Sequence, residues 1–420
     1  MAKIINKLRL GYLGKRNFFD EYFRLFKYGG LNSANRFAKM LYNAIKTERL
    51  IEHDNKGIVH FFIPPIPSQS FARHIRTYAD SIILKQKTQH LCDVLISTTR
   101  KCPYDCWYCS AINTPYGEIK IEDIEKIICI LKEWGTSTIG FTGGEPLLRT
   151  DTDEIIRRYS DEFTFIIFTS GHGLNLLRAK NLKECGLFYI AISLDSYDKA
   201  ENDKARGVKG AYEHSIDAIK NAKKAGLYTI IQSVVTKSML ANRRILKFID
   251  FVKELDVEEL LLLEPLGTGR IFNCDNEVFL SKNEHNQLKV LHDDATKNME
   301  LPKIYSFADM EDHTRLGCGA GIYHSYIDVT GDLWPCNYLP ISLGNILKEP
   351  NTVYKRLKKY FKKPCSHCIL MKERRNLQKL SDGKLPIPFE KAERLLEKHA
   401  KSISNEDIPN FYTSVGRYYD

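Results

Sequence analysis

The amino-acid sequence predicts an α/β fold built on a parallel sheet. From about residue 93 to 265, short runs of β-forming residues alternate with longer amphipathic segments. Repeated strand-then-helix units need crossover connections, which make the strands parallel in a sheet that is doubly wound or curled into part of a barrel. In such folds the chemistry collects at the carboxyl ends of the strands.

Six apolar runs supply the predicted strands, and the segments between them have helical length. The connecting segment at 211–226 ends in Gly226, which suits a helix C-terminus. The runs are "DVLIST" (93–98), "TIGFTG" (138–143), "FTFIIFTS" (163–170), "YIAISLD" (189–195), "YTIIQSVV" (228–235) and "ELLLLEP" (259–265).

The regions on either side of this core differ from it in composition. Helical patterns at 18–30 and 32–50 precede the core, and the rigid "IPPIP" at 63–67 closes that extension. A helix is predicted at about 281–299. We expect a helical extension (1–85), the core (86–270), a connecting helical segment (271–312), a cysteine-bearing module (313–375) and a C-terminal helix with an aromatic tail (376–420).

The composition predicts a cytoplasmic globular protein. Hydrophobic residues make up 43% and charged residues 27% of the 420 positions. No run approaches the ~20 apolar residues of a membrane-spanning helix. The start of the chain lacks the apolar region and cleavage site of a secretory signal. The eleven cysteines are clustered, which in a reducing compartment indicates metal or iron-sulfur sites rather than disulfides.

Three cysteines follow the first predicted strand in "KCPYDCWYCSA", residues 101–111. They are Cys102, Cys106 and Cys109. A structural zinc site needs four ligands, and the strand at 93–98 would carry Cys92 to the other end of the sheet. A [4Fe-4S] cluster held by three thiolates instead leaves one iron open for another ligand.

The loop "FTGGEP", residues 141–146, ends the second predicted strand. Gly143 and Gly144 allow the backbone to approach a ligand closely, and Glu145 offers an acceptor for an ammonium group. In isolation this loop is equally an ordinary turn before a helix.

The spacing Cys-x3-Cys-x2-Cys followed by GGEP resembles the radical S-adenosylmethionine (SAM) superfamily. The resemblance covers about 93–270 and implies a partial (β/α)6 TIM-like barrel. It also implies a [4Fe-4S] cluster and reductive cleavage of SAM to a 5′-deoxyadenosyl radical, which abstracts hydrogen from an unactivated carbon. The electron would come from a reductant such as ferredoxin or flavodoxin.

The same resemblance implies where SAM binds. Tyr108 would pack against the adenine. Four further residues, Ser170, Ser193, Asp195 and Arg206, are equally compatible with helix caps or surface charge. The implied contacts are Gly143, Gly144, Glu145 and Pro146 at the methionine amine, and Ser170, Ser193, Asp195 and Arg206 at the ribose and the carboxylate.

A second cysteine set lies downstream. Cys318 and Cys336 flank a predicted hairpin with "TGD" at its turn, and Cys365 and Cys368 belong to "PCSHC". Four thiolates close either a zinc or an iron-sulfur site. The resemblance to the SPASM/twitch subfamily implies an auxiliary [4Fe-4S] cluster of the shorter twitch type, because no cysteine follows Cys368 to hold a second one.

A fully ligated auxiliary cluster favours electron transfer and a net oxidation, or C-C or C-S bond formation. Cys274 is an alternative ligand or a catalytic thiol. Cys92, Cys129 and Cys185 lie in apolar or helical contexts and are predicted to be inert core residues. No catalytic residue is assigned from the sequence.

The sequence does not decide between several classes of substrate or ligand. The net charge is +10, of which residues 1–28 contribute +5 among many aromatic residues. This composition suits a membrane lipid substrate and peripheral contact with the inner membrane face, unless the aromatics pack on the barrel. Peptide modification is the alternative enzyme function. A zinc-stabilised nucleic-acid-binding protein, with "YKRLKKYFKK" (354–363) facing phosphates, is the alternative without catalysis.

Overall fold

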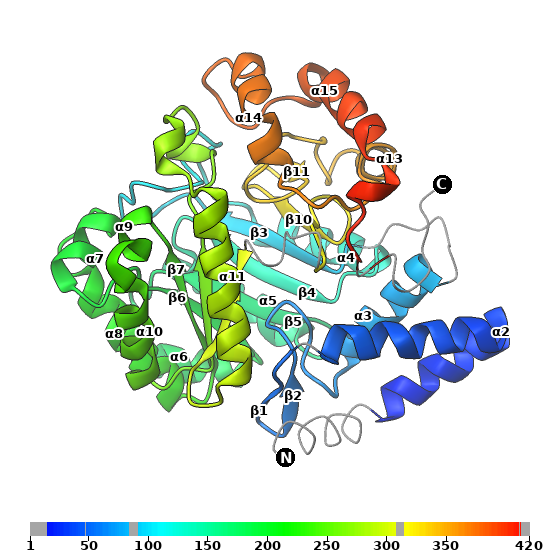
Figure 1. Ribbon diagram of the computed structural model, residues 1–420, viewed down its shortest axis with the longest axis horizontal. Coiled ribbons are helices and arrows are strands. Elements are labelled where there is room, and N and C mark those ends of the chain that lie inside the picture. Colours follow the sequence, from blue (N-terminus) through cyan, green and yellow to red (C-terminus); the bar gives the residue numbers. More distant parts are fainter. Residues whose placement is uncertain (1–14, 47, 84–90, 308–314, 411, 413–420) are drawn as a thin grey trace.

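The protein is built around one nine-stranded sheet with helices on its outer face (Figure 1). The strand order is β11-β10-β3-β4-β5-β6-β7-β8-β9, and within this sheet only the β10–β11 pair is antiparallel. The predicted α/β fold with a parallel sheet is confirmed, in a form consistent with a partial barrel. The computed structural model describes residues 15–46, 48–83, 91–307, 315–410 and 412.

In chain order, the first six strands of this sheet, β3 to β8, coincide closely with the six predicted runs. β9 extends the sheet at one end, and the predicted hairpin, β10–β11, extends it at the other. The strands are β3 (Asp93–Thr99), β4 (Thr138–Gly143), β5 (Thr164–Thr169), β6 (Tyr189–Ser193), β7 (Tyr228–Val234), β8 (Glu259–Leu263), β9 (Lys303–Ser306), β10 (His324–Ile327) and β11 (Leu333–Trp334).

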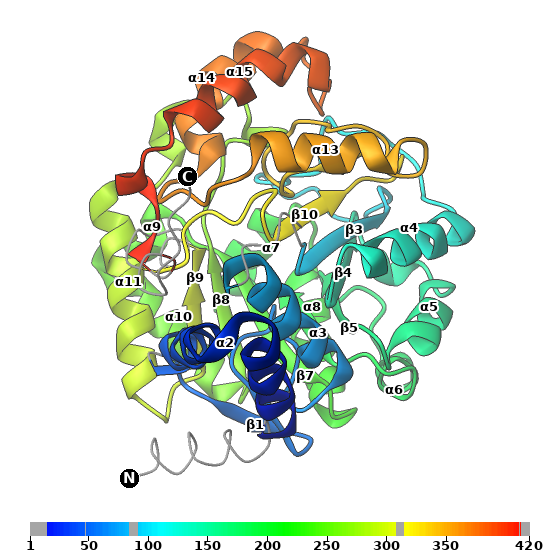
Figure 2. The same ribbon diagram turned by 90° about the vertical axis from the view of Figure 1, so that its right-hand side faces the viewer.

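Side chains alternate between the two faces of each strand. Val94 and Ile96 face the core beneath the outer helices. Leu95 faces the opposite, inner side of the sheet, where it packs against Trp334. Figure 2 shows the helices α13 to α15 together beyond the β10 edge. The helices after β3 are α4 (Ile121–Glu133), α5 (Thr152–Tyr159), α6 (Leu176–Glu184), α7 (Lys199–Arg206), α8 (Ala211–Lys224), α9 (Lys237–Leu240), α10 (Arg244–Glu254), α11 (Lys282–Lys297), α13 (Pro350–Tyr360), α14 (Ile369–Leu380) and α15 (Phe389–Ser402).

The N-terminal region, together with Ile408 and Tyr412 from near the C-terminal end, forms a small separate core. It contains α2 (Lys15–Lys46), which bends at Gly30 where φ is 70°, and α3 (Gln69–Tyr78). A two-stranded hairpin that the sequence did not predict, β1 (Ile51–His53) and β2 (Lys56–Ile58), follows α2. The basic positions before residue 15 and the aromatic tail after residue 412 lie outside the described residues. Among the described helices, none combines the length and apolar character needed to span a membrane.

A buried polar network fills the amino end of the sheet. The Lys303 ammonium group is buried, donates to the Arg49 carbonyl oxygen at 2.9 Å, and lies 3.2 Å from the Glu48 carboxylate. Burial opposes ionisation of Glu48, but the charge of Lys303, other nearby groups and a hydrogen bond from the Tyr305 hydroxyl together outweigh it, and the pKa falls to about 2. On β8, burial raises the pKa of Glu259 to about 7.

Candidate functional site

The loop with three cysteines lies beyond the carboxyl end of β3. The Cys109 amide donates to the Cys106 carbonyl at 3.2 Å, and the Arg270 amide donates to the Cys109 carbonyl at 2.9 Å. The Asp105 amide donates to the Arg206 carbonyl at 3.0 Å. Burial raises the pKa of the Cys106 thiol to about 11, so metal binding would have to displace its proton. Two segments that follow β6 and β8, at Arg206 and Arg270, therefore hold this loop through backbone hydrogen bonds.

Gly143 and Gly144 let the second loop pack directly on the first. The Gly144 amide donates to the Thr99 carbonyl at 2.6 Å, and the Glu145 amide donates to the Lys101 carbonyl at 2.8 Å. A Cβ atom on Gly143 would lie 2.2 Å from the Thr99 oxygen, and one on Gly144 would lie 2.2 Å from the Lys101 oxygen. The glycines are thus required for contact between the two loops, a reason the sequence did not reveal.

The Glu145 carboxylate is buried and accepts hydrogen bonds within the chain. Oε1 accepts from the Leu147 amide at 3.0 Å and the Thr169 hydroxyl at 2.6 Å. Oε2 accepts from the Ser170 amide at 2.7 Å and from the Ser170 hydroxyl. Pro146 then begins a short 3-10 helix. These donors orient Glu145, while its contact with an ammonium group stays a prediction.

Tyr108, Asp195 and Arg206 form one buried network. The Tyr108 hydroxyl donates to Asp195, and Arg206 donates to the Tyr108 oxygen at 2.6 Å. The guanidinium lies 3.6 Å from the Asp195 carboxylate. Burial raises the pKa of Tyr108 well above its usual value, although Arg206 opposes this. The sequence analysis assigned each of these residues to the SAM site individually. It did not predict that they contact one another.

The second cysteine set assembles beside the β10 edge of the sheet. The Cys318 amide donates to the Cys365 carbonyl at 2.7 Å, and the Leu339 amide donates to the Cys336 sulfur at 3.2 Å. A hydrogen bond from Cys318 lowers the pKa of Cys365 to about 5, against the effect of burial. Four thiolates would close a zinc or an iron-sulfur site, and the auxiliary cluster at these cysteines stays a prediction. Over the described ranges, no three His, Cys, Asp or Glu side chains converge closely enough to hold a single metal ion.

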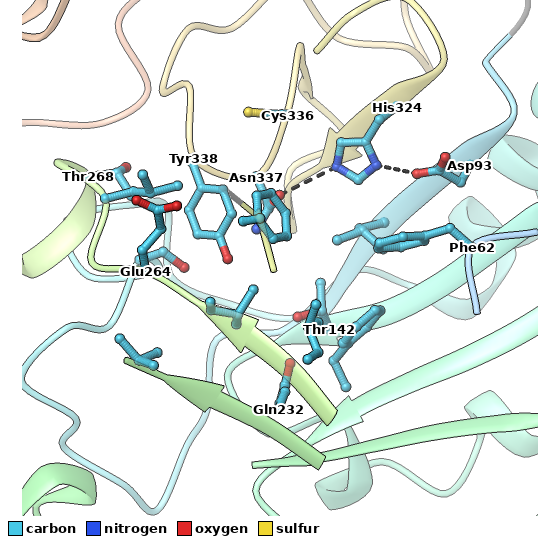
Figure 3. A pocket seen from close by; sticks show the side chains of 18 of the residues that line it. Phe62, Asp93, Thr142, Gln232, Glu264, Thr268, His324, Cys336, Asn337 and Tyr338 are labelled. Carbon is cyan, nitrogen blue, oxygen red and sulfur yellow. Dashed lines mark hydrogen bonds and ion pairs between the residues drawn. The ribbon is translucent and has the colours of Figure 1, made fainter. Parts of the chain in front are cut away.

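One cavity of about 920 Å³ brings the two cysteine sets together. All the predicted SAM contacts except Pro146 line it. Figure 3 shows part of its wall, with Cys336 above and Gln232 of β7 below. The cysteines that line it are Cys102, Cys106 and Cys109 from the first set, and Cys318, Cys336 and Cys368 from the second.

The remaining cysteines lie away from the cavity lining. Cys92 and Cys185 are buried, as predicted. Cys129 is exposed on α4, so its prediction as a core residue was wrong: its position in an amphipathic helix did not reveal that it faces outward. The Cys274 carbonyl accepts a hydrogen bond from Arg374 at 2.8 Å, and its thiol is half-buried.

Comparison with known families agrees with this geometry. Residues 96–248 match the model of the radical SAM superfamily. Over this segment the chain is similar to radical SAM enzymes. This result confirms the expectation of an enzyme and does not support a non-catalytic zinc protein that binds nucleic acid.

Relatives with assigned functions differ in the reaction they catalyse. The chain is 28% identical to the AdoMet-dependent heme synthase of Nitratidesulfovibrio vulgaris, over 60% of this chain and 75% of the relative. It is 33% identical to the probable GTP 3′,8-cyclase of Methanocella arvoryzae, over 38% of this chain and about half, 52%, of the relative. These relatives support radical SAM chemistry in general.

Two solved structures share the fold. Streptococcus suis SuiB bound to precursor peptide SuiA superposes with a TM-score of 0.51 at 18% identity, over 64% of each chain. Native anSMEcpe with bound AdoMet gives 0.52 at 20% identity, over 74% of this chain and 100% of that one. At these identities the likeness concerns the fold alone.

Proposed function

We propose that this enzyme cleaves SAM reductively at the Cys102, Cys106 and Cys109 loop and abstracts hydrogen from a substrate held in the adjoining cavity. A [4Fe-4S] cluster there would supply an electron, received from ferredoxin or flavodoxin, to form the 5′-deoxyadenosyl radical. The chain's own residues bind and orient SAM. Glu145 and the Tyr108 network are held rigidly by their hydrogen bonds, and the cavity walls exclude water.

We further propose that Cys318, Cys336, Cys365 and Cys368 hold an auxiliary [4Fe-4S] cluster in a twitch-like module at 313–375. The observation that carries this proposal is the shared cavity, which members of both cysteine sets line. A substrate in that cavity lies between them, in position to exchange an electron with a closed cluster. Net oxidation, or C-C or C-S bond formation, follows from that arrangement.

Anaerobic reconstitution tests both sites. We expect about eight irons per chain, four for each cubane cluster, and 5′-deoxyadenosine after addition of dithionite and SAM. A value near four irons would refute the auxiliary cluster alone. A colourless protein that contains zinc and does not cleave SAM would refute the whole proposal.

For the substrate class we propose a membrane lipid, because α2 carries an aromatic face whose side chains are largely exposed. Phe19, Phe23 and Phe26 are 41%, 63% and 50% exposed, at the spacing of one helical face. Phe18 and Tyr22 instead pack on the N-terminal core. Part of the aromatic set is therefore buried and part is available for peripheral contact with a membrane.

Vesicle flotation tests the membrane contact. Replacing Phe19, Phe23 and Phe26 together with Ser should lower binding to anionic vesicles at least about ten-fold, since each buried Phe contributes roughly 1.5–3 kcal/mol. Leu177→Ser is the matched control, because Leu177 is a single exposed apolar side chain on α6. Equal binding of the triple variant and the control would leave peptide modification as the better substrate class.

A further inference from the structure

A second polar centre lies in the cavity, made by Asp93, His324 and Asn337. Asp93 and His324 are the first residues of β3 and β10, and they are directly opposite each other in the parallel pair. All three residues line the cavity. Figure 3 shows the His324 ring between the Asp93 carboxylate and the Asn337 side chain. The proposed contacts to SAM use none of these residues.

The partners of His324 define how its two ring nitrogens are used. Nδ1 contacts the Asp93 carboxylate, and Nε2 lies 3.4 Å from Asn337 Oδ1. The Asp93 carboxylate only accepts hydrogen bonds, so Nδ1 donates to it, and Nε2 faces the amide oxygen of Asn337. Burial disfavours the charged ring, but Asp93 and Asn337 outweigh it and raise the pKa of His324 above its usual value.

In this arrangement the Asn337 amide presents its oxygen to His324. Because Oδ1 faces His324, the amide nitrogen and its two hydrogens point elsewhere. Across the parts of the chain that the structure describes, no acceptor is bonded to that nitrogen, and Asn337 is half-buried in the cavity wall. The centre therefore offers neutral donors rather than a charged anchor.

The surroundings of the centre are apolar. Phe62 packs against the His324 ring at 5.9 Å between centroids, and Leu95 and Phe168 also line this part of the cavity. A charged group would lose its hydration against these apolar walls. A neutral acceptor joined to a hydrocarbon would match both the donors and the walls.

We propose that Asn337, oriented by His324 and Asp93, donates hydrogen bonds to an acyl carbonyl oxygen of the substrate, from an ester or an amide. The proposal rests on the proposed function only in that the substrate occupies this cavity. Asn337 is then a specificity-determining residue, and His324 and Asp93 are positioning residues.

Calorimetric titration of the full-length protein with methyl octanoate, octanamide and 1-methoxyoctane tests the proposal. The ether has a similar chain but no carbonyl group. The wild type should bind the ester or the amide about ten-fold more tightly than the ether, the effect of one buried hydrogen bond. Preference for the ester or for the amide identifies the source of the carbonyl.

Asn337→Asp keeps the side-chain shape but replaces the donors with an acceptor, so it should remove the preference for a carbonyl. Asp93→Leu should weaken it as well, because the substitution removes the partner of Nδ1, and a neutral His324 can then accept from the Asn337 amide at Nε2 and turn Oδ1 toward the cavity. Asn35→Asp, at an exposed position on α2, is the matched control.

Equal wild-type binding of ester, amide and ether would overturn the proposal, and so would an unchanged preference in folded Asn337→Asp. Thermal melts of each variant verify folding. No measurement here uses SAM or a reductant. Failure of SAM cleavage would therefore refute the proposed function without affecting the carbonyl site.

Discussion

Replacing Cys106 with Ala is expected to abolish formation of 5′-deoxyadenosine, whereas replacing Cys365 with Ala should leave part of it and stop conversion of substrate. Cys106 is one of three thiols in a loop that offers no fourth ligand. Its loss should cost at least about 100-fold, the upper end for changes to outer partners of a metal ligand. The measurements are 5′-deoxyadenosine by chromatography and iron per chain.

The different outcome for Cys365 follows from its position. Its sulfur belongs to the second set, next to Cys318 and away from the Gly144 and Glu145 contacts that hold the SAM loop. Cys129→Ala, at the exposed cysteine on α4, controls for removal of any thiol. Equal loss of 5′-deoxyadenosine in both variants would argue against separate roles for the two sets.

Local sequence patterns were sufficient for the sheet and for the motif loops. Each of the six apolar runs became a strand, because a short run of β-forming residues is a local property of the sequence. The two motif loops, at 101–111 and 141–146, lie together because both follow the carboxyl ends of adjacent parallel strands. The fold class alone therefore predicts that the two loops are neighbours.

Contacts between distant segments could not be predicted in this way. Asp93 and His324 are 231 positions apart and meet because β10 pairs with β3, which no local pattern specifies. The hydrogen bond from Arg206 to Tyr108 likewise depends on the position of α7 beside the cysteine loop. For Asp93, the sequence offered one signal of a functional role: an acidic residue at the first position of an otherwise apolar strand.

Gly144→Ala is expected to disable the SAM site through the backbone, without removing any functional group. The added Cβ would lie 2.2 Å from the Lys101 oxygen, 2.7 Å from the Lys101 carbonyl carbon and 2.8 Å from the Arg100 carbonyl carbon. These are main-chain atoms, so the loop that carries Cys102 must move. We expect destabilisation of about 1–3 kcal/mol, as for overpacking in a core, together with loss of the iron at this site.

Gly173→Ala separates this clash from the general cost of an added side chain. At Gly173 φ is +78°, and no atom lies within 4 Å of the added Cβ, so only backbone strain of roughly 1–2 kcal/mol is expected. Its iron content and SAM cleavage should match the wild type. If Gly144→Ala retained both clusters and normal cleavage, close packing of the two loops would not be what positions Cys102. If Gly173→Ala lost iron as well, stability rather than loop geometry would explain the effect.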